Sequence, residues 1–188
     1  LYNSLKSHGP YKLIKNNINI GVVNFSNCDD SIIHTSLLDK IKYDLKEIGV
    51  TTEIEVFRAP SEVNTNALTE LVHSAKEKSI DIMLPIFPDI PITEEYEEDE
   101  EDTFENEDYY VKLKSIFLGK GMPSQVVLEK TIGNRYAIGN IVLGILGKTG
   151  NLPFILAEQL HFTDLVIGLD VARKEKKKQS GSINIASS

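Results

Sequence analysis

Four side chains in the second half of the chain have the chemistry to bind a phosphate group together. Tyr110 and Lys114 are four residues apart, so a helix would place them on one face. Gln125 follows a Gly-Met-Pro-Ser turn, and Lys148 ends an apolar stretch with helical spacing. Lysine supplies charge to a phosphate, while tyrosine and glutamine supply neutral hydrogen bonds. The four side chains therefore indicate an anion site, provided that the fold brings them together.

The apolar pattern of the chain predicts the elements that would position these residues. Apolar, β-branched runs alternate with segments of helical spacing, and this β-α-β-α-β order is typical of an α/β fold with a Rossmann-like parallel sheet and helices on both faces. A Ser-Gly-Ser turn near the end predicts a terminal β-hairpin. We expect strands at 18–25, 52–57, 80–87, 125–130, 152–157, 165–171 and 183–186, and helices at about 33–48, 64–75, 108–118 and 136–147.

Three further features favour phosphate binding. Loops that follow parallel strands meet at the carboxyl edge of a sheet, where ligands bind. Gly139 and Gly144 would let other groups approach the helix at 136–147 closely. The loop 119–124 offers backbone amides close to Gln125, and such amides can form a nest for an anion.

The acidity of the chain is concentrated in one tract. The formal net charge is −8, but residues 94–108 contain eleven acidic residues and no Lys or Arg. Without this tract, 17 acidic residues remain against 20 basic ones. We expect the tract to be a solvated loop, so the net charge does not exclude a nucleic-acid partner for the rest of the chain.

The other bulk features indicate a cytoplasmic protein with no membrane partner. Cys28 is the only cysteine, so no intrachain disulfide can form. No apolar run approaches the roughly 18 residues that a membrane span requires, and no signal peptide is visible. The chain starts at Leu1 without Met and ends on a strand-like segment, so we expect it to be a piece of a larger protein.

Several common site types do not fit the sequence. The turn after the first expected strand, 26–31, has no glycine and two acidic residues, which excludes a dinucleotide-binding Rossmann site. The Gly-Lys-Thr at 147–149 ends a helix rather than beginning one, which argues against a P-loop. Nothing orients Cys28 and His34 as a nucleophile and its base, and His161 stands alone between two expected strands.

Three motifs resemble one known family. Residues 120–125 (KGMPSQ), 147–153 (GKTGNLP) and 166–171 (VIGLDV) are similar to archaeal Argonautes, over the MID domain and the first strands of the PIWI domain. Residues 1–16, with Gly9-Pro10 and scattered basic residues, indicate only a lead-in segment of low information. The resemblance implies a MID domain at 17–163 that contains the acidic loop 94–108, and the start of an RNase H-like PIWI domain at 164–188.

The resemblance also implies roles for the four residues. In Argonautes a Tyr, a Lys one turn later, a Gln and a second Lys grip the 5′-phosphate of a guide strand, and Tyr110, Lys114, Gln125 and Lys148 match them in type and order. The tyrosine ring would also stack on the first base. Relatives often hold the phosphate, or a Mg²⁺ or Mn²⁺ ion beside it, with a polar residue one turn before the second lysine.

The chain departs from the family at that position, because Gly144 stands there. Asn140, two turns before Lys148 on the same face, is a candidate replacement, and Asn151 is a candidate for an auxiliary guide contact. Asp170 matches the first catalytic, metal-binding aspartate of PIWI. That site needs further carboxylates, so Asp170 could act only in the parent protein.

The expected function is therefore binding of the 5′-phosphorylated end of a short, single-stranded DNA or RNA guide. The parent would be a guide-directed endonuclease that pairs the guide with a target strand and uses Mg²⁺ or Mn²⁺. Two alternatives stay open. One is a regulatory domain of the same fold that binds a nucleotide or small anion with the same lysines. The other is a protein-interaction module that uses the acidic tract.

Overall fold

A computed structural model describes residues 2–89, 101–155, 170–174 and 183–187, with side chains in 2–89 and 109–155. The chain divides into two compact units, Leu1–Ile155 and Leu156–Ser188, and each is considered by itself. Within the described residues, no helix has both the length and the apolar character needed to cross a membrane.

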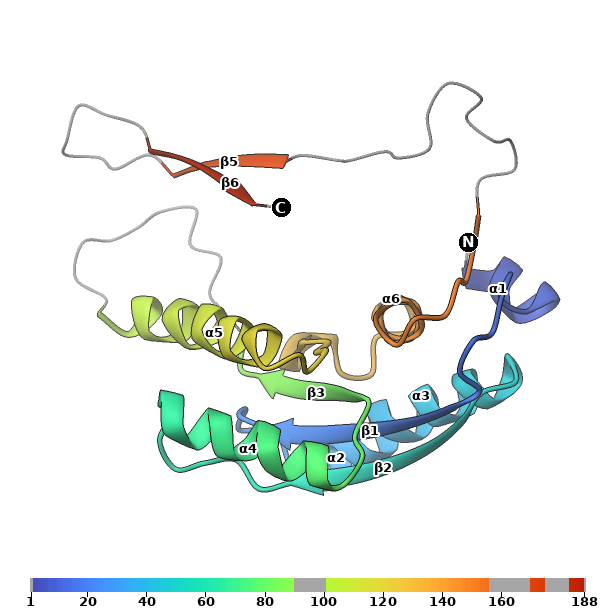
Figure 1. Cartoon of the computed structure of the whole chain (residues 1–188), viewed down its shortest axis with the longest axis horizontal. Coiled ribbons are helices and arrows are strands. Elements are labelled where there is room, and N and C mark those ends of the chain that lie inside the picture. The colour runs from blue at the N-terminus through green and yellow to red at the C-terminus, as the bar shows by residue number, and fades with distance from the viewer. Residues whose placement is uncertain (1, 90–100, 156–169, 175–182, 188) are drawn as a thin grey trace. The chain divides into compact units, whose positions relative to one another are not determined.

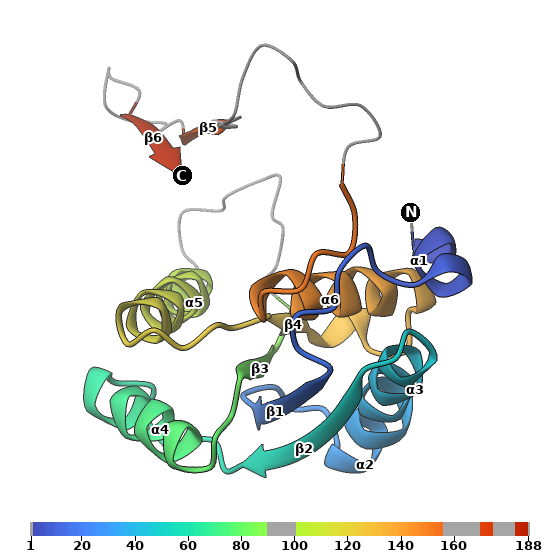
Figure 2. The ribbon, with the colours of Figure 1, turned by 45° about the vertical axis from the view of Figure 1, so that its right-hand side comes forward.

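The first unit is built on a four-stranded parallel sheet in the order β2-β1-β3-β4. The strands are β1 (Asn17–Asn24), β2 (Thr51–Phe57) and β3 (Ile82–Phe87), labelled in Figure 1, and β4 (Val127–Leu128), labelled in Figure 2. All six residues of β3 are buried, as a strand covered on both faces requires. β4 is shorter than the predicted 125–130, because a 3₁₀ turn at Glu129–Thr131 takes over after Leu128.

Helices cover both faces of the sheet, which confirms the predicted fold class. α4 (Thr65–Glu77) and α5 (Glu101–Gly119) lie on one face, and α3 (Asp39–Glu47) and α6 (Arg135–Lys148) lie on the other (Figure 2). α3 continues from the short α2 (Asp30–Ile33) through a π-helical turn at His34–Leu38. The side chain of Asn64 accepts a hydrogen bond from the backbone N–H of Ala67 at 2.9 Å and so caps α4, as predicted.

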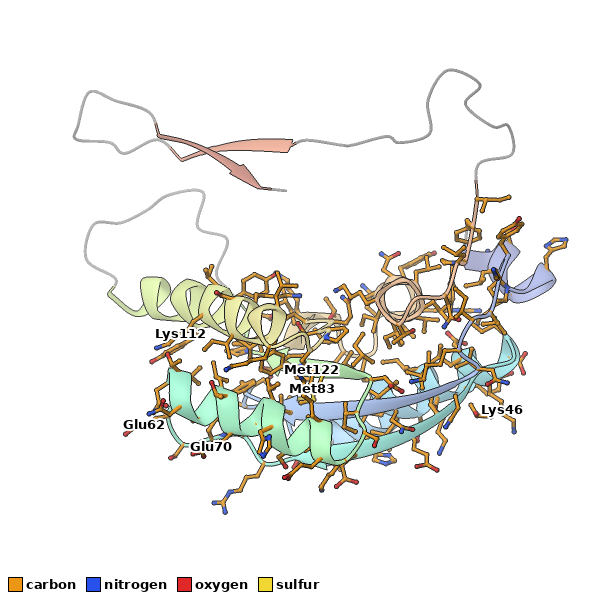
Figure 3. All side chains as sticks on the ribbon, in the orientation of Figure 1. Lys46, Glu62, Glu70, Met83, Lys112 and Met122 are labelled. Carbon is orange, nitrogen blue, oxygen red and sulfur yellow. The ribbon has the colours of Figure 1, made fainter. Side chains whose placement is uncertain are left out.

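The core under α4 and α5 is packed closely enough to require a glycine in β1. An added Cβ at Gly21 would lie 2.4 Å from Sδ of Met83 and 3.0 Å from the ring of Phe57. Met83 and Met122 both belong to this buried layer, and Figure 3 shows them between the helices and the sheet. A larger residue at 21 would therefore displace the methionine that packs across the sheet.

The lead-in segment at 1–16, from which the sequence predicted no element, is part of the fold. It forms α1 (Tyr2–His8), whose Leu5 is fully buried. The ring of Tyr2 packs so close to α6 that a Cβ on Gly139 would meet it at 2.8 Å. Further along, Lys12 and Leu152 form an isolated antiparallel bridge, where a strand at 152–157 was expected; residues 156 and 157 lie outside the described part.

The second half of the acidic tract is helical, which corrects the prediction of a loop over all of 94–108. α5 begins at Glu101 and includes residues 101–108, while 94–100 lie outside the described residues. Glutamate is a good helix former, and acidic residues near a helix N-terminus interact favourably with the helix dipole. The acidic run therefore extends α5 instead of interrupting it.

The second unit contains the predicted terminal hairpin. β5 (Asp170–Lys174) pairs antiparallel with β6 (Ile183–Ser187), and Asp170 lies opposite Ser187. The part of the expected strand at 165–169 lies outside the described residues. The hairpin thus joins the first residues of the basic run at 173–178 to the last apolar segment of the chain.

Candidate functional site

Two of the predicted lysines converge on one backbone oxygen. The Lys148 ammonium donates to the carbonyl oxygen of Ser124 at 2.7 Å, and the Lys114 ammonium donates to the same oxygen at 3.1 Å. The two charges come from residues 34 positions apart in the sequence, one within α5 and one at the last residue of α6. The fold therefore places two cations side by side, as the anion-site hypothesis requires.

The shared oxygen is held in place by the sheet. The backbone N–H of Met83 donates to Pro123, and the backbone N–H of Gln125 donates back to Met83, both at 2.9 Å. Ser124 is itself only 7% exposed and forms a parallel bridge with Met83, the second residue of β3. The lysines thus meet beside the amino-terminal half of β3, not at the carboxyl edge of the sheet, where we had expected the ligand.

Gln125 joins the same cluster through its side chain. Its Oε1 accepts a hydrogen bond from Lys148 at 2.8 Å, and its Nε2 donates to the Val126 carbonyl at 3.3 Å. The side chain can lie there because α6 has a glycine opposite it: a Cβ on Gly144 would stand 2.3 Å from Oε1. The expectation that Gly139 and Gly144 allow close approach is confirmed, the first by Tyr2 and the second by Gln125.

Tyr110 lies one helical turn from this cluster, at the side of the aromatic core. Its ring meets the ring of Phe87 edge to face, with centroids 6.4 Å apart, and Phe87 in turn stacks on Phe25 at 5.1 Å. The Lys114 ammonium is 6.0 Å from the centroid of the Tyr110 ring. The phenol is therefore half-buried beside one of the two lysines, and its ring packs against Phe87, the last residue of β3.

The electrostatics of the cluster favour an anion. Burial lowers the pKa of Lys114. Burial also lowers the pKa of Lys148, and the charge of Lys114 lowers it further. Across residues 2–89 and 109–155, neither lysine forms a salt bridge with a carboxylate. A bound anion would relieve the repulsion between the two ammonium groups.

The loop 119–124 does not form the expected nest of free amides. The backbone N–H groups of Lys120, Gly121 and Met122 donate to carbonyls in the last turns of α5, and Pro123 has no N–H. Gly121 takes a φ of +65°, the left-handed conformation typical of a helix C-terminus. The loop therefore ends α5 and presents a carbonyl, not amides, to the lysines.

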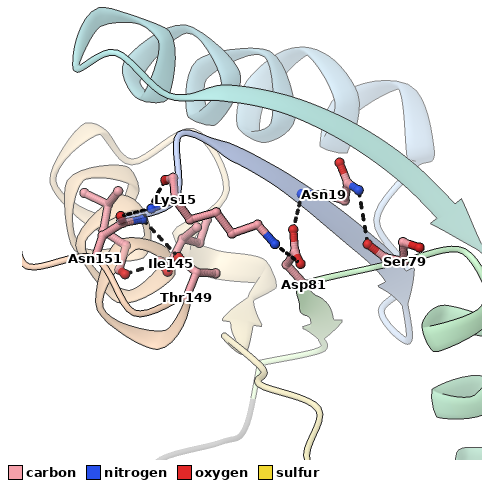
Figure 4. Close-up of polar contacts among 8 residues, drawn as sticks. Lys15, Asn19, Ser79, Asp81, Ile145, Thr149 and Asn151 are labelled. Atoms are coloured by element: carbon pink, nitrogen blue, oxygen red, sulfur yellow. Dashed lines mark hydrogen bonds and ion pairs between the residues drawn. The ribbon is translucent and has the colours of Figure 1, made fainter. Parts of the chain in front are cut away.

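The two candidate asparagines have different surroundings. Asn140 is exposed on the same face of α6 as Gly144 and Lys148, one and two turns away from them. Asn151 is 1% exposed, and its Oδ1 accepts from the backbone N–H groups of Ile14 at 2.8 Å and Lys15 at 2.9 Å (Figure 4).

The amide nitrogen of Asn151 is engaged as well. It donates to the carbonyl of Lys15 at 3.1 Å and to the hydroxyl of Thr149 at 3.4 Å. Lys15 continues the connection, since its ammonium pairs with Asp81, which also accepts from the backbone N–H of Asn19 at 2.9 Å. This geometry gives the Asn151 side chain a structural role and leaves no group of its amide for a direct guide contact.

The metal prediction finds little support in the donor set of the cluster. Mg²⁺ and Mn²⁺ prefer several hard oxygen ligands, usually with carboxylates among them. The oxygens available here, the Ser124 carbonyl and Gln125 Oε1, already accept from ammonium groups. Among the residues that the structure describes, no group of three or more His, Cys, Asp or Glu could hold an ion. The backbone of Asp170 starts β5, and its side chain lies outside the described residues.

Sequence reasoning missed the residue that organises the cluster. The motif drew attention to the Gln125 side chain, whereas both lysines bind the backbone of its neighbour, Ser124. A carbonyl group carries no sequence signature, because every residue has one. The available signal was indirect: a Pro-Ser-Gln segment that leads into a strand places consecutive backbone groups at the edge of the sheet.

Comparison with known proteins gives consistent results. A model of the Piwi domain matches residues 102–187. The curated protein argonaute of Aquifex aeolicus (strain VF5) is 32% identical over 110 residues, which cover 56% of this chain and 16% of that protein.

Two solved structures have the same fold over nearly the whole chain. A crystal structure of Aa-Ago with externally bound siRNA has a TM-score of 0.60 at 18% identity and covers 99% of this chain. A structure of Aquifex aeolicus Argonaute has a TM-score of 0.56 at 20% identity and covers 98%. In both cases this chain corresponds to 26% of the relative.

The first unit is thus a Rossmann-like sheet with two lysines paired at Ser124, and the terminal hairpin lies within the stretch that matches the Piwi domain. The chain is therefore similar to the Argonaute family, in agreement with the resemblance of its motifs. It spans 16% of the length of the curated relative and 26% of each of the two solved chains. These matches therefore do not assign the activity of a whole Argonaute to this chain.

Proposed function

We propose that the first unit binds the 5′-phosphate of a short single-stranded guide nucleic acid at Lys114, Gln125 and Lys148. The observation that carries this proposal is the convergence of the two ammonium groups on the Ser124 carbonyl. In the free protein that oxygen and Gln125 Oε1 accept the lysine hydrogen bonds. A phosphate offers three stronger acceptor oxygens and a negative charge, so it would compete well for the same donors.

Tyr110 contributes a planar surface beside the phosphate. Its ring is half-buried and packs against the ring of Phe87, a contact that restricts its orientation before a ligand binds. Stacking of a base on an aromatic ring contributes roughly 1–3 kcal/mol and does not depend strongly on the base. The tyrosine would thus hold the first nucleotide of the guide, while the lysines hold its phosphate.

The comparisons support a nucleic-acid partner at the family level. The structure of Aa-Ago that shares this fold is described with externally bound siRNA. For the present chain, we propose that the parent protein pairs its guide with a target strand and cleaves it as a metal-dependent endonuclease. Asp170, at the start of β5, would belong to that catalytic site together with residues of the rest of the protein.

The test is fluorescence anisotropy with two short single strands that differ only in a 5′-phosphate or a 5′-hydroxyl. The native chain should prefer the phosphate by about tenfold or more, because charged hydrogen bonds contribute roughly 1.5–3 kcal/mol each. Lys148→Ala should remove most of that preference. Lys112→Ala is the matched control: Lys112 is an exposed lysine of α5, labelled in Figure 3, only two residues from Lys114.

The rival functions give different results in the same assay. A free nucleoside monophosphate that competes as strongly as the 5′-phosphorylated strand would favour a metabolite-binding domain. Binding that is lost when residues 94–108 are removed, and is unaffected by Lys148→Ala, would favour a protein-interaction module. Guide binding predicts an affinity that rises with strand length and falls with salt, since each contacted phosphate releases counterions.

A further inference from the structure

The charge that a terminal phosphate requires is already present in the cluster as two ammonium groups. A phosphate monoester carries about −1.5 to −2 charges at pH 7. Lys114 and Lys148 both reach the Ser124 carbonyl, at 3.1 and 2.7 Å, and within residues 2–89 and 109–155 neither is neutralised by a carboxylate. From this geometry, and resting on the proposed function, we infer that the site binds a phosphate dianion directly through its two lysines, without a divalent metal ion.

The first argument is the placement of the positive charges. Both ammonium groups lie within hydrogen-bond distance of one oxygen, so a dication at that oxygen would face two cations at short range. Two like charges 4 Å apart repel by several kcal/mol at the effective dielectric constant of a protein surface. Burial already disfavours the charged forms of both lysines, so the cluster gains from an anion and loses from a further cation.

The second argument is the geometry around Gly144. This residue lies one helical turn before Lys148, so its side chain would project toward the same site, but it has none. The space is filled by the Gln125 amide, whose oxygen would be 2.3 Å from a Cβ at that position. That amide oxygen accepts from Lys148 at 2.8 Å, so it is turned toward an ammonium group rather than offered to a metal.

The third argument is that an anion could replace the present acceptors of the two lysines directly. The Ser124 carbonyl and Gln125 Oε1 hold the lysines in position without cancelling their charge, since both are neutral acceptors. A phosphate needs only to take the place of these two oxygens as the acceptor of the lysine hydrogen bonds. No protein group has to be deprotonated, and no Mg²⁺ ion has to give up its hydration waters, which it does reluctantly.

The deciding experiment measures the preference for a 5′-phosphate over a 5′-hydroxyl strand with the native chain, once in Mg²⁺ and once in EDTA. Ionic strength is matched between the two buffers, because Mg²⁺ also screens phosphate charges along the whole strand. The expected result is a preference that differs by less than about twofold between the buffers. A preference present in Mg²⁺ and reduced tenfold or more in EDTA would overturn the inference and leave the proposed function intact.

The same experiment separates the two claims. If neither buffer shows a preference for the phosphate, the proposed function itself fails, and with it the inference that rests on it. An independent readout is a Mn²⁺ titration, followed by electron paramagnetic resonance, of the chain saturated with each strand. We expect the same Mn²⁺ isotherm for both strands. An additional equivalent of tightly bound Mn²⁺ that appears only with the 5′-phosphate would show that a metal takes part.

Discussion

The amide oxygen of Gln125 lies where the side chain of residue 144 would begin, since a Cβ on Gly144 would stand 2.3 Å from it. The two positions are therefore coupled: the glutamine can accept from Lys148 only while residue 144 is a glycine. This relationship connects the glycine at 144, where the resemblance led us to expect a polar residue, to the geometry of the proposed phosphate site.

The coupling can be tested with Gly144→Ala. The new methyl group should displace the Gln125 amide and weaken binding of the 5′-phosphate by about threefold to tenfold, the value of one hydrogen bond. Gln125→Ala should cause a similar loss, and the double variant Gln125→Ala/Gly144→Ala should lose no more than either one. Additive losses in this double-mutant cycle would show that the two residues act independently.

Lys114 is expected to trade stability for binding. Its pKa is lowered from the ordinary value of 10.5, mainly by burial. At any pH below this lowered pKa the side chain is charged in the folded protein, and its burial then reduces the free energy of unfolding. Between the lowered pKa and 10.5 the unfolded chain binds more protons, so stability rises with pH in that window.

Lys114→Met should therefore raise the free energy of unfolding at pH 7, by less than about 1 kcal/mol because partial exposure screens the effect. It should at the same time lower phosphate-strand affinity about tenfold. Urea unfolding and anisotropy on the same sample measure both quantities. The Ser124 carbonyl keeps its bond from Lys148 in this variant, so no buried acceptor is left unpaired. A clear loss of stability would contradict the assigned cost.

The pH dependence of binding should have two limits. Below about pH 6 the phosphate monoester gains a proton and loses one charge, so the preference over a 5′-hydroxyl should fall. On the basic side, the preference should decline at a lower pH than an ordinary lysine would require, because the pKa values of Lys114 and Lys148 are both lowered. Anisotropy titrations at constant ionic strength measure both limits. A preference that stays constant up to pH 10.5 would contradict the pKa shifts.

Substitution of the two candidate asparagines should have different effects: Asn151 should affect stability, and Asn140 should not. Asn151→Ala removes the oxygen that accepts from the backbone N–H groups of Ile14 and Lys15, and the loss of these hydrogen bonds should cost about 1–3 kcal/mol in urea unfolding. Asn140→Ala, at an exposed position, should change stability by less than about 0.5 kcal/mol. If Asn140 contacts the guide, its variant should instead weaken binding. A stability loss at Asn140 equal to that at Asn151 would argue against this division.

The glycine in β1 gives a prediction for the core alone. Gly21→Ala should reduce the free energy of unfolding by about 1–3 kcal/mol, because the new methyl group would overlap Sδ of Met83. Gly119→Ala is the matched control, since a Cβ there would meet nothing within 4 Å. Thermal unfolding of the two variants should differ by several degrees, and equal midpoints would show that the core can accommodate the methyl group.

Much of this fold could be predicted because local patterns decide it. The apolar runs that form β1 and β3 are typical of strands covered on both faces, and Asn64 caps α4 with the bond that its position suggested. The convergence of Lys114, Gln125 and Lys148 also followed from residue types and from the resemblance.

The features that were missed depend on contacts between distant parts of the chain. α1 is seven residues long, and its fully buried side chain, Leu5, gives too short a pattern to recognise. Asn151 reads as an ordinary loop residue until its partners, more than 130 positions away, are known. The start of α5 was placed too late, because acidic density was interpreted as solvation although glutamate also favours helix.

The hydrogen bonds of Asn151 also set the boundary of any transplantable unit that carries the proposed phosphate site. They attach the residues before β1 to the turn that directly follows Lys148, and Lys15 carries the connection on to Asp81. A chimaera that exchanged residues 17–155 between relatives, and kept the host's own first 16 residues, would separate this asparagine from the backbone it was matched to. Exchange of the unit with its lead-in should preserve the position of Lys148, whereas exchange without it should not.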